Sequence, residues 1–141
     1  MGMRICSNEK LSFRYEDKEW KLESIPDESN PDCIATLTYT DGSYFNLIAF
    51  PIEMPSLEVY KDIVEASLIA DDAEIISSEI VNFEGRQSLQ VHSHIAIPEI
   101  EFDMFSAIFL EDDFLYIFEL RAVSDIVSKF MDIVKTFEIK D

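Results

Sequence analysis

The spacing of apolar and polar residues predicts strands over most of the chain. In LSFRYED (11–17), Leu, Phe and Tyr alternate with polar or charged residues, which is the period of a strand with one buried face. Two further β-rich runs flank Asp41-Gly42 in CIATLTYTDGSYFNLIAFPI. An Asp-Gly pair between such runs predicts a hairpin, because both residues tolerate a positive φ.

Four more strands are predicted to form a meander in the second half of the chain. The runs EIISSEIVNF and RQSLQVHSHIAI flank Glu84-Gly85, which indicates a second hairpin. The runs EFDMFSAIFL and DFLYIFELRA follow, with Glu111, Asp112 and Asp113 as the turn between them. The centre of this meander is apolar at both alternating positions, so we expect at least part of the sheet to be covered on both faces.

Two segments have the spacing of helices instead. In SLEVYKDIVEASL an apolar stripe is formed by Leu57, Tyr60, Val64 and Leu68. This stripe predicts a helix over roughly 56–69, with Ser56 as its N-cap and the acidic DDAE at its end. In SDIVSKFMDIVKTFEI (124–139) a second stripe is formed by Ile126, Phe130, Ile133, Val134 and Phe137. It predicts a second helix, capped by Ser124.

The order of these elements predicts a single α+β domain over residues 1–141. The proline- and acid-rich IPDESNPD (25–32) has no periodicity and is expected to be a loop. Connections of hairpin length favour antiparallel pairing over βαβ crossovers. We therefore expect an antiparallel sheet of about six to eight strands with two helices packed on it.

The charge of the chain restricts its partners. Its 141 residues include 29 Asp and Glu against 11 Lys and Arg, a formal net charge of −18. A field of this sign repels phosphate backbones, which argues against nucleic acid as a partner. It favours solubility and the docking of a basic protein.

The sequence also indicates a compartment. MGMRICSNEK has no apolar run of the kind that a secretory signal needs, and no segment approaches the roughly 20 apolar residues of a membrane span. Cys6 and Cys33 lack metal-type or CxxC spacing and are expected to be free thiols in a reducing compartment. We therefore expect a cytoplasmic protein with no membrane span.

The stretch QVHSHIAIPEIEFD (90–103) carries the candidate chemistry. Its His92, His94 and Glu99, after Gly85, resemble the first metal-binding motif of the cupins. However, a cupin needs a further histidine from a later strand, and the chain has two histidines in all. The strand period instead places both histidines on the polar side of a half-buried strand. We favour that interpretation and predict no metal, while His92, His94 and Glu99 stay the candidates for a zinc or iron site.

No other arrangement indicates catalysis. The three glycines do not form a phosphate-binding loop, and Cys33 beside an acidic loop would have its thiolate disfavoured. We therefore predict a protein that is not an enzyme and that has no cofactor.

The order of elements resembles the PsbP-like fold, which the Ran-binding protein Mog, DcrB and chaperones of type VI secretion effectors share. The resemblance rests on LSFRYEDKEW, NLIAF, SLEVYKDIVEASL, NFEGRQSLQV, FLYIFELRA and VSKFMDIVKTFEI. It covers nearly the whole chain, and Glu16 stands where the family usually has a proline. The resemblance implies a binding or chaperone role rather than catalysis.

Three functions follow as hypotheses. The first is a cytoplasmic adaptor or chaperone-like module for a basic or apolar protein partner, which could also form a homodimer through its outer strands. The second is an immunity-type inhibitor of a basic toxin, and the third is a metal-dependent enzyme using the two histidines and Glu99. For the first, the candidate contacts are an apolar region over 102–109 that includes Phe105, and two acidic turns, formed by Asp71, Asp72, Glu111, Asp112 and Asp113.

Overall fold

The structure is a computed structural model and describes residues 2–7, 9–23 and 33–140. The strands are β1 (Met3–Ser7), β2 (Leu11–Glu16), β3 (Trp20–Leu22), β4 (Cys33–Tyr39), β5 (Tyr44–Pro51), β6 (Glu74–Phe83), β7 (Arg86–Ile97), β8 (Ile100–Glu111), β9 (Phe114–Ala122) and β10 (Glu138–Ile139). The helices are α1 (Leu57–Ala70) and α2 (Val127–Val134). The predicted loop over 25–32 lies outside the described residues.

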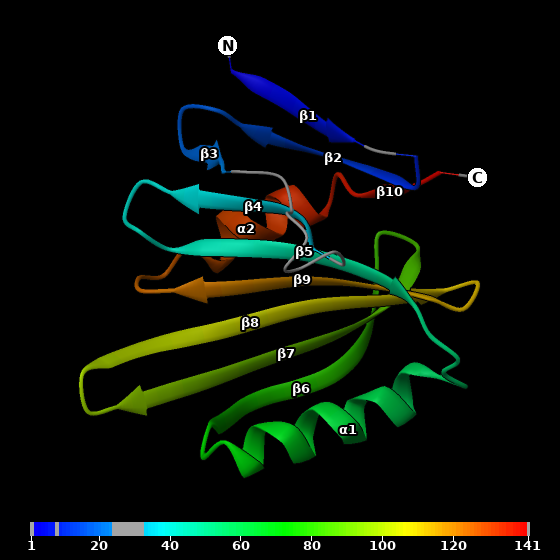
Figure 1. Cartoon of the computed structure of the whole chain (residues 1–141), viewed down its shortest axis with the longest axis vertical. Helices are drawn as coiled ribbons and strands as arrows, with labels where there is room; N and C mark the ends of the chain where they lie inside the picture. The colour runs from blue at the N-terminus through cyan, green and yellow to red at the C-terminus, as the bar shows by residue number, and fades with distance from the viewer. Residues whose placement is uncertain (1, 8, 24–32, 141) are drawn as a thin grey trace.

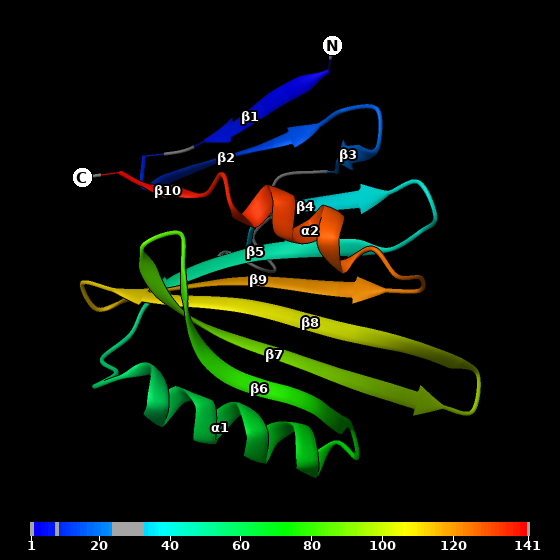
Figure 2. The same ribbon diagram turned by 180° about the vertical axis from the view of Figure 1, so that it is seen from behind.

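The strands form two antiparallel sheets. The larger has the order β3-β4-β5-β9-β8-β7-β6, and the smaller has the order β1-β2-β10. Figures 1 and 2 show α2 between the small sheet and the large one, and α1 alongside β6 at the opposite margin. The prediction of an antiparallel α+β fold with two helices is confirmed.

Both faces of the large sheet are covered, as the pattern of the meander predicts. The face under α2 and the small sheet holds an aromatic core that includes Phe13, Phe45, Phe109, Phe118 and Phe130. The face under α1 holds a smaller aliphatic cluster of Leu57, Leu89, Val91, Ile108 and Leu115. Adjacent residues of β8, Ile108 and Phe109, therefore lie in different cores.

The predicted hairpins and their turns are present. β4 pairs with β5, β6 with β7, and β8 with β9. In the first turn only Gly42 has a positive φ, of 96°, and the Asp41 carboxylate accepts the Ser43 N–H at 2.8 Å. In the third, Asp112 and Asp113 take φ values of 53° and 59°, which Asp tolerates better than most residues.

The first helix is confirmed, and it runs over Leu57–Ala70. The Ser56 hydroxyl accepts the N–H of Val59 at 3.3 Å, so the predicted N-cap is also present. Leu57 is the one residue of α1 that is fully buried. The helix therefore covers the sheet with one side and leaves much of its surface exposed.

The second helix is shorter than predicted. It spans Val127–Val134, begins after Ile126 without a side-chain cap, and is followed by β10, which pairs with β2. The Ser124 hydroxyl does not cap the helix but bonds the Asp41 carboxylate of a distant turn. Unwinding after Val134 lets Glu138 and Ile139 pair with Ser12 and Leu11 of β2, and the N–H of Lys140 bonds the carbonyl of Lys10, just before β2, at 2.7 Å. The five residues of the predicted stripe are all buried.

No helix in the described part of the chain is long and apolar enough to cross a membrane.

Candidate functional site

The large sheet has two ends, and each collects acidic residues. The histidine end consists of the β7–β8 turn at Pro98 and Glu99, the connection 71–73 and the segment 123–125. The Arg86 end consists of the β8–β9 turn, the β6–β7 turn and the start of α1. The two ends lie on opposite sides of the molecule in Figure 1. The predicted contacts Asp71 and Asp72 therefore lie at the histidine end, whereas Glu111, Asp112 and Asp113 lie at the Arg86 end.

A chain of ion pairs occupies the histidine end. The hairpin register sets His94 opposite Asp103, and the two side chains meet at 2.5 Å between Nδ1 and Oδ1. The other ring nitrogen of His94, Nε2, lies 2.7 Å from Oε1 of Glu101. His92 approaches the same aspartate, with 3.3 Å from Nε2 to Oδ2. Asp103 thus contacts both histidines.

The contact between His94 and Asp103 favours the charged forms of both side chains. Hydrogen bonds to Asp103 and Glu101 raise the pKa of His94, because a ring with a carboxylate at each nitrogen is best satisfied when doubly protonated. The hydrogen bond from His94, with a smaller effect from the nearby His92 ring, lowers the pKa of Asp103. All three side chains keep contact with water, since His92 and His94 are half-buried and Asp103 is more open still.

The predicted metal candidates are only partly brought together. His92 and His94 are neighbours on one face, whereas Glu99 is exposed in the turn and does not line the groove beside them. Within residues 2–7, 9–23 and 33–140, no group of three or more His, Cys, Asp or Glu side chains is arranged to hold a metal ion. The polar-face interpretation describes the histidines better than the cupin motif does.

A groove of about 610 Å³ opens beside the histidines. It is lined by His92, His94, Glu101, Phe102, Asp103, Ala122, Val123, Ser124, Asp125 and Val127. Its charged walls come from β7, β8 and the segment after β9, and its apolar part comes from Ala122, Val123 and the first residue of α2.

Exposed apolar side chains are concentrated at this end of the sheet, and Val123 is the one of them that lines the groove. Of the nine large apolar side chains that are exposed among the described residues, five lie at or near the histidine end: Ile69, Ile76, Ile97, Ile100 and Val123. They are between 49% and 66% exposed. Apolar and acidic side chains on one surface are typical of a protein-binding region.

The apolar region predicted over 102–109 is not an open surface. Ala107, Ile108 and Phe109 are buried, and this expectation is wrong for them. Phe105 is half-buried, with its ring centroid 6.0 Å from that of Phe130 on α2 and 6.0 Å from that of His92. Phe102 does line the groove.

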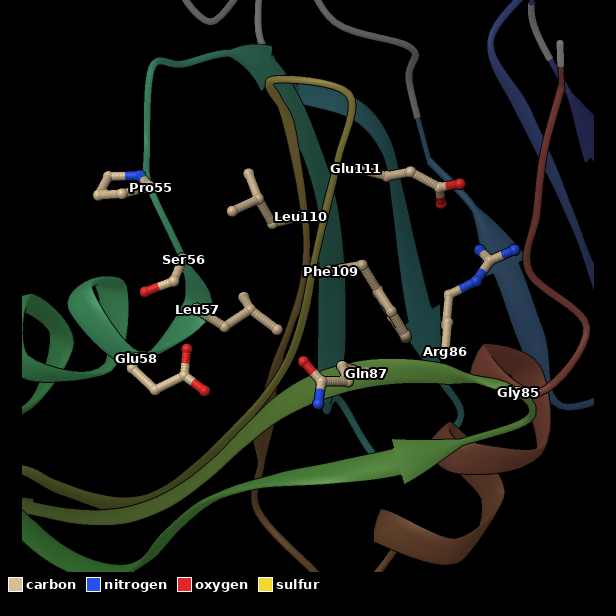
Figure 3. A pocket seen from close by; sticks show the side chains of 10 residues that line it. All are labelled: Pro55, Ser56, Leu57, Glu58, Gly85, Arg86, Gln87, Phe109, Leu110 and Glu111. Carbon is tan, nitrogen blue, oxygen red and sulfur yellow. The ribbon is translucent and has the colours of Figure 1, made fainter.

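The Arg86 end has a second hollow, of about 470 Å³, with a different lining (Figure 3). Figure 3 shows Arg86 and Glu111 on one side of it and Ser56, Leu57 and Glu58 on the other. The Arg86 guanidinium carbon lies 5.5 Å from the centroid of Phe137 and 6.0 Å from that of Phe109. Its buried Nη1 has no hydrogen-bond partner in the described part of the chain. The hollow thus combines one cation with two carboxylates.

The cysteines provide no activated nucleophile at either end. Burial raises the pKa of the Cys6 thiol, which disfavours the thiolate. The side chain of Cys33 lies outside the described part of the structure.

Sequence reasoning missed part of the groove. The pairing of His94 with Asp103 follows from a two-residue turn at 98–99, so counting outward from that turn would have found it. Val123 and Asp125 gave no such signal, because the register of β8 with β9 brings them to the groove from another hairpin.

Comparison with known proteins extends the account of the fold. No protein-family model matches the sequence, and no curated protein matches it. Among solved structures, cyanobacterial PsbP (CyanoP) from Synechocystis is similar with a TM-score of 0.73 and 13% identity, over 99% of this chain and 93% of that one. A protein from Bacteroides thetaiotaomicron has a TM-score of 0.63 and 13% identity, over 93% of this chain and 45% of that one. This chain thus matches just under half of the Bacteroides protein, and the resemblance to the PsbP-like fold is confirmed.

Proposed function

We propose that this chain is a cytoplasmic, non-enzymatic protein-binding module, adaptor or chaperone-like, that holds a basic segment of its partner at the histidine end. The observation that carries the proposal is the coincidence of exposed apolar and acidic side chains there. Val123 lines the groove together with the carboxylates of Glu101 and Asp125, and the exposed Ile97 and Ile100 flank the β7–β8 turn at the same end of the sheet. Apolar contacts supply most of the affinity of such surfaces, and charge selects the partner.

The electrostatics of the chain support a basic partner. A net charge of −18 attracts cations from a distance and accelerates encounter with a positively charged surface. The hollow at the Arg86 end gives no such preference, because the positive charge of Arg86 partly cancels the negative charges of Glu58 and Glu111.

The test compares two matched triple variants. One replaces Ile97, Ile100 and Val123 by Ser at the histidine end. The control replaces Ile5, Ile63 and Val59 by Ser. These three are also exposed and of the same residue types, but they lie elsewhere on the molecule. A partner is first captured from a lysate of the host with the wild-type protein, then purified, and its Kd is measured for all three proteins at low and high salt.

We expect the histidine-end triple to weaken binding by at least about tenfold and the control by less than about twofold. We also expect affinity to fall with ionic strength. Equal losses of affinity in the two triple variants would contradict the proposal, and so would an affinity that neither variant changes. If the purified partner is an enzyme that the chain inhibits, the same surface acts in an immunity-type role.

A further inference from the structure

We infer that the groove at the histidine end receives a lysine or arginine side chain of the partner, next to an aliphatic residue. This inference rests on the function proposed above and adds the chemistry of the partner's contact. It is carried by the shape of the groove, its charges and its apolar part.

The groove has the dimensions of a specific subsite. Its volume of about 610 Å³ falls within the range of ligand-binding clefts and exceeds what one long side chain needs. Its walls come from β7, β8 and the last residue of β9, from the segment 123–125, and from the first residue of α2.

The charge of the groove is negative in every protonation state of its histidines near neutrality. Glu101, Asp103 and Asp125 contribute three carboxylates, and no Lys or Arg lies among the lining residues. Even with His92 and His94 both protonated, the carboxylates outnumber the cations. From the neighbouring strand β6, Glu74 stands opposite His94 and adds a further carboxylate.

One of these three carboxylates makes no ion pair with either histidine. Glu101 and Asp103 contact the rings, whereas Asp125, on the segment after β9, pairs with neither. A guanidinium or ammonium group between Asp125 and the carboxylates of β8 would form charge-assisted hydrogen bonds in a partly desolvated site. An anionic ligand would meet repulsion from the same groups.

The apolar part of the groove fits the stem of such a side chain. Lys and Arg bury their methylene groups along apolar surface while the charged head reaches polar partners. Ala122, Val123 and Val127 offer that surface within the same groove as the carboxylates. Val123, 55% exposed, is also open to an aliphatic residue beside the basic one.

The experiment titrates the ¹⁵N-labelled protein with an acetylated, amidated hexapeptide of alternating leucine and lysine. The comparison peptide has glutamine in place of lysine. One variant carries Glu101→Gln, Asp103→Asn and Asp125→Asn, and the matched control carries Glu111→Gln, Asp112→Asn and Asp113→Asn. Both triples remove three charges, and Asn tolerates the positive φ at positions 112 and 113.

We expect lysine-peptide shifts to concentrate at 101–103 and 122–127, an affinity at least about tenfold weaker in the groove triple, and little change in the control. The single variant Asp125→Asn leaves the histidine contacts intact and should weaken binding about threefold or more, which keeps the test valid if the triple does not fold.

The outcomes separate this inference from the proposed function. Equal weakening by both triples, or shifts spread over both ends, overturns the groove as the subsite while leaving an acidic docking surface in place. Equal binding of the lysine and glutamine peptides overturns the basic side chain as the occupant. If the purified partner binds the wild type tightly and the peptide does not bind, the inference fails and the proposed function stands.

Discussion

The two ends of the large sheet are both acidic, but they differ in what accompanies the acids. At the histidine end, carboxylates and the exposed Val123 line a groove that no Lys or Arg lines, and exposed isoleucines lie at the same end of the sheet. At the Arg86 end, Glu58 and Glu111 share a hollow with Arg86, and Val59 is the exposed apolar residue nearest to it. The acidic turns are therefore common to both ends, and apolar exposure is what distinguishes the histidine end, which is why we propose that end as the docking surface.

The largest effect is expected from a substitution in the aromatic core, because both ends of the sheet depend on that core for stability. Phe118 is fully buried, and its ring centroid lies 5.0 Å from that of Phe137 and 6.0 Å from that of Phe13. Phe118→Ala should lower the free energy of unfolding by about 3–5 kcal/mol. Urea denaturation measures it, and Phe114→Ala, at a half-buried position, is the control with a smaller loss. A loss below that of the control would show that the ends are independently stable.

The same substitution, Gly to Ala, can be made in one turn near each end, and the two losses of stability can then be compared. Gly42, near the histidine end, has a φ of 96°, and Gly85, at the Arg86 end, has a φ of 86°. A Cβ at either position would meet no atom within 4 Å, so substitution by Ala adds backbone strain alone. Each variant should lose about 1–2 kcal/mol of unfolding free energy. A loss at one position only would mean that one turn relaxes.

The half-buried carboxylate of Glu119 should respond to substitution with a gain of stability instead of a loss. Burial raises the pKa of Glu119, and the charge of Arg121 only partly offsets this. Ionisation therefore disfavours the folded state once the pH exceeds the pKa of the unfolded chain, and the penalty is complete above the folded pKa. Glu119→Gln should raise the free energy of unfolding at pH 7 by about 1 kcal/mol or less. The gain should vanish near pH 4 in urea titrations, and a gain that persists there would have another cause.

The smallest expected effect is a pH dependence confined to the histidine end. The raised pKa of His94 means that its pairing stabilises the fold fully below the pKa of an unfolded histidine and no longer does so once the pH has risen through the folded pKa. The lowered pKa of Asp103 has the reverse sign, so its contribution is lost as the pH falls through that value. His94→Gln should therefore lower the urea midpoint at pH 6 and leave it nearly unchanged at pH 9. A shift of equal size at both pH values would show that the ring acts by packing alone.

Local patterns predicted most of the fold. The hairpins and α1 rest on neighbouring residues, such as Asp41-Gly42 and Ser56, and they form as expected. The end of α2 did not follow its pattern, because residues after Val134 find partners on β2 that no local rule indicates. The same holds for the site: the histidines were visible in one strand, whereas Val123 and Asp125 reach the groove through tertiary structure.

The pairing of β10 with β2 has a consequence for the order in which the molecule is made. The Thr136 hydroxyl accepts the Arg14 N–H at 2.7 Å, across 122 residues of sequence. β5 likewise pairs with β9, which is synthesised much later. On a translating ribosome the β1–β2 and β4–β5 hairpins can therefore close early, but β2 and β5 each lack one permanent neighbour until β10 and β9 emerge. We expect β6, β7 and β8 to be paired with one another before β2 and β5, which are synthesised earlier, gain their second neighbours.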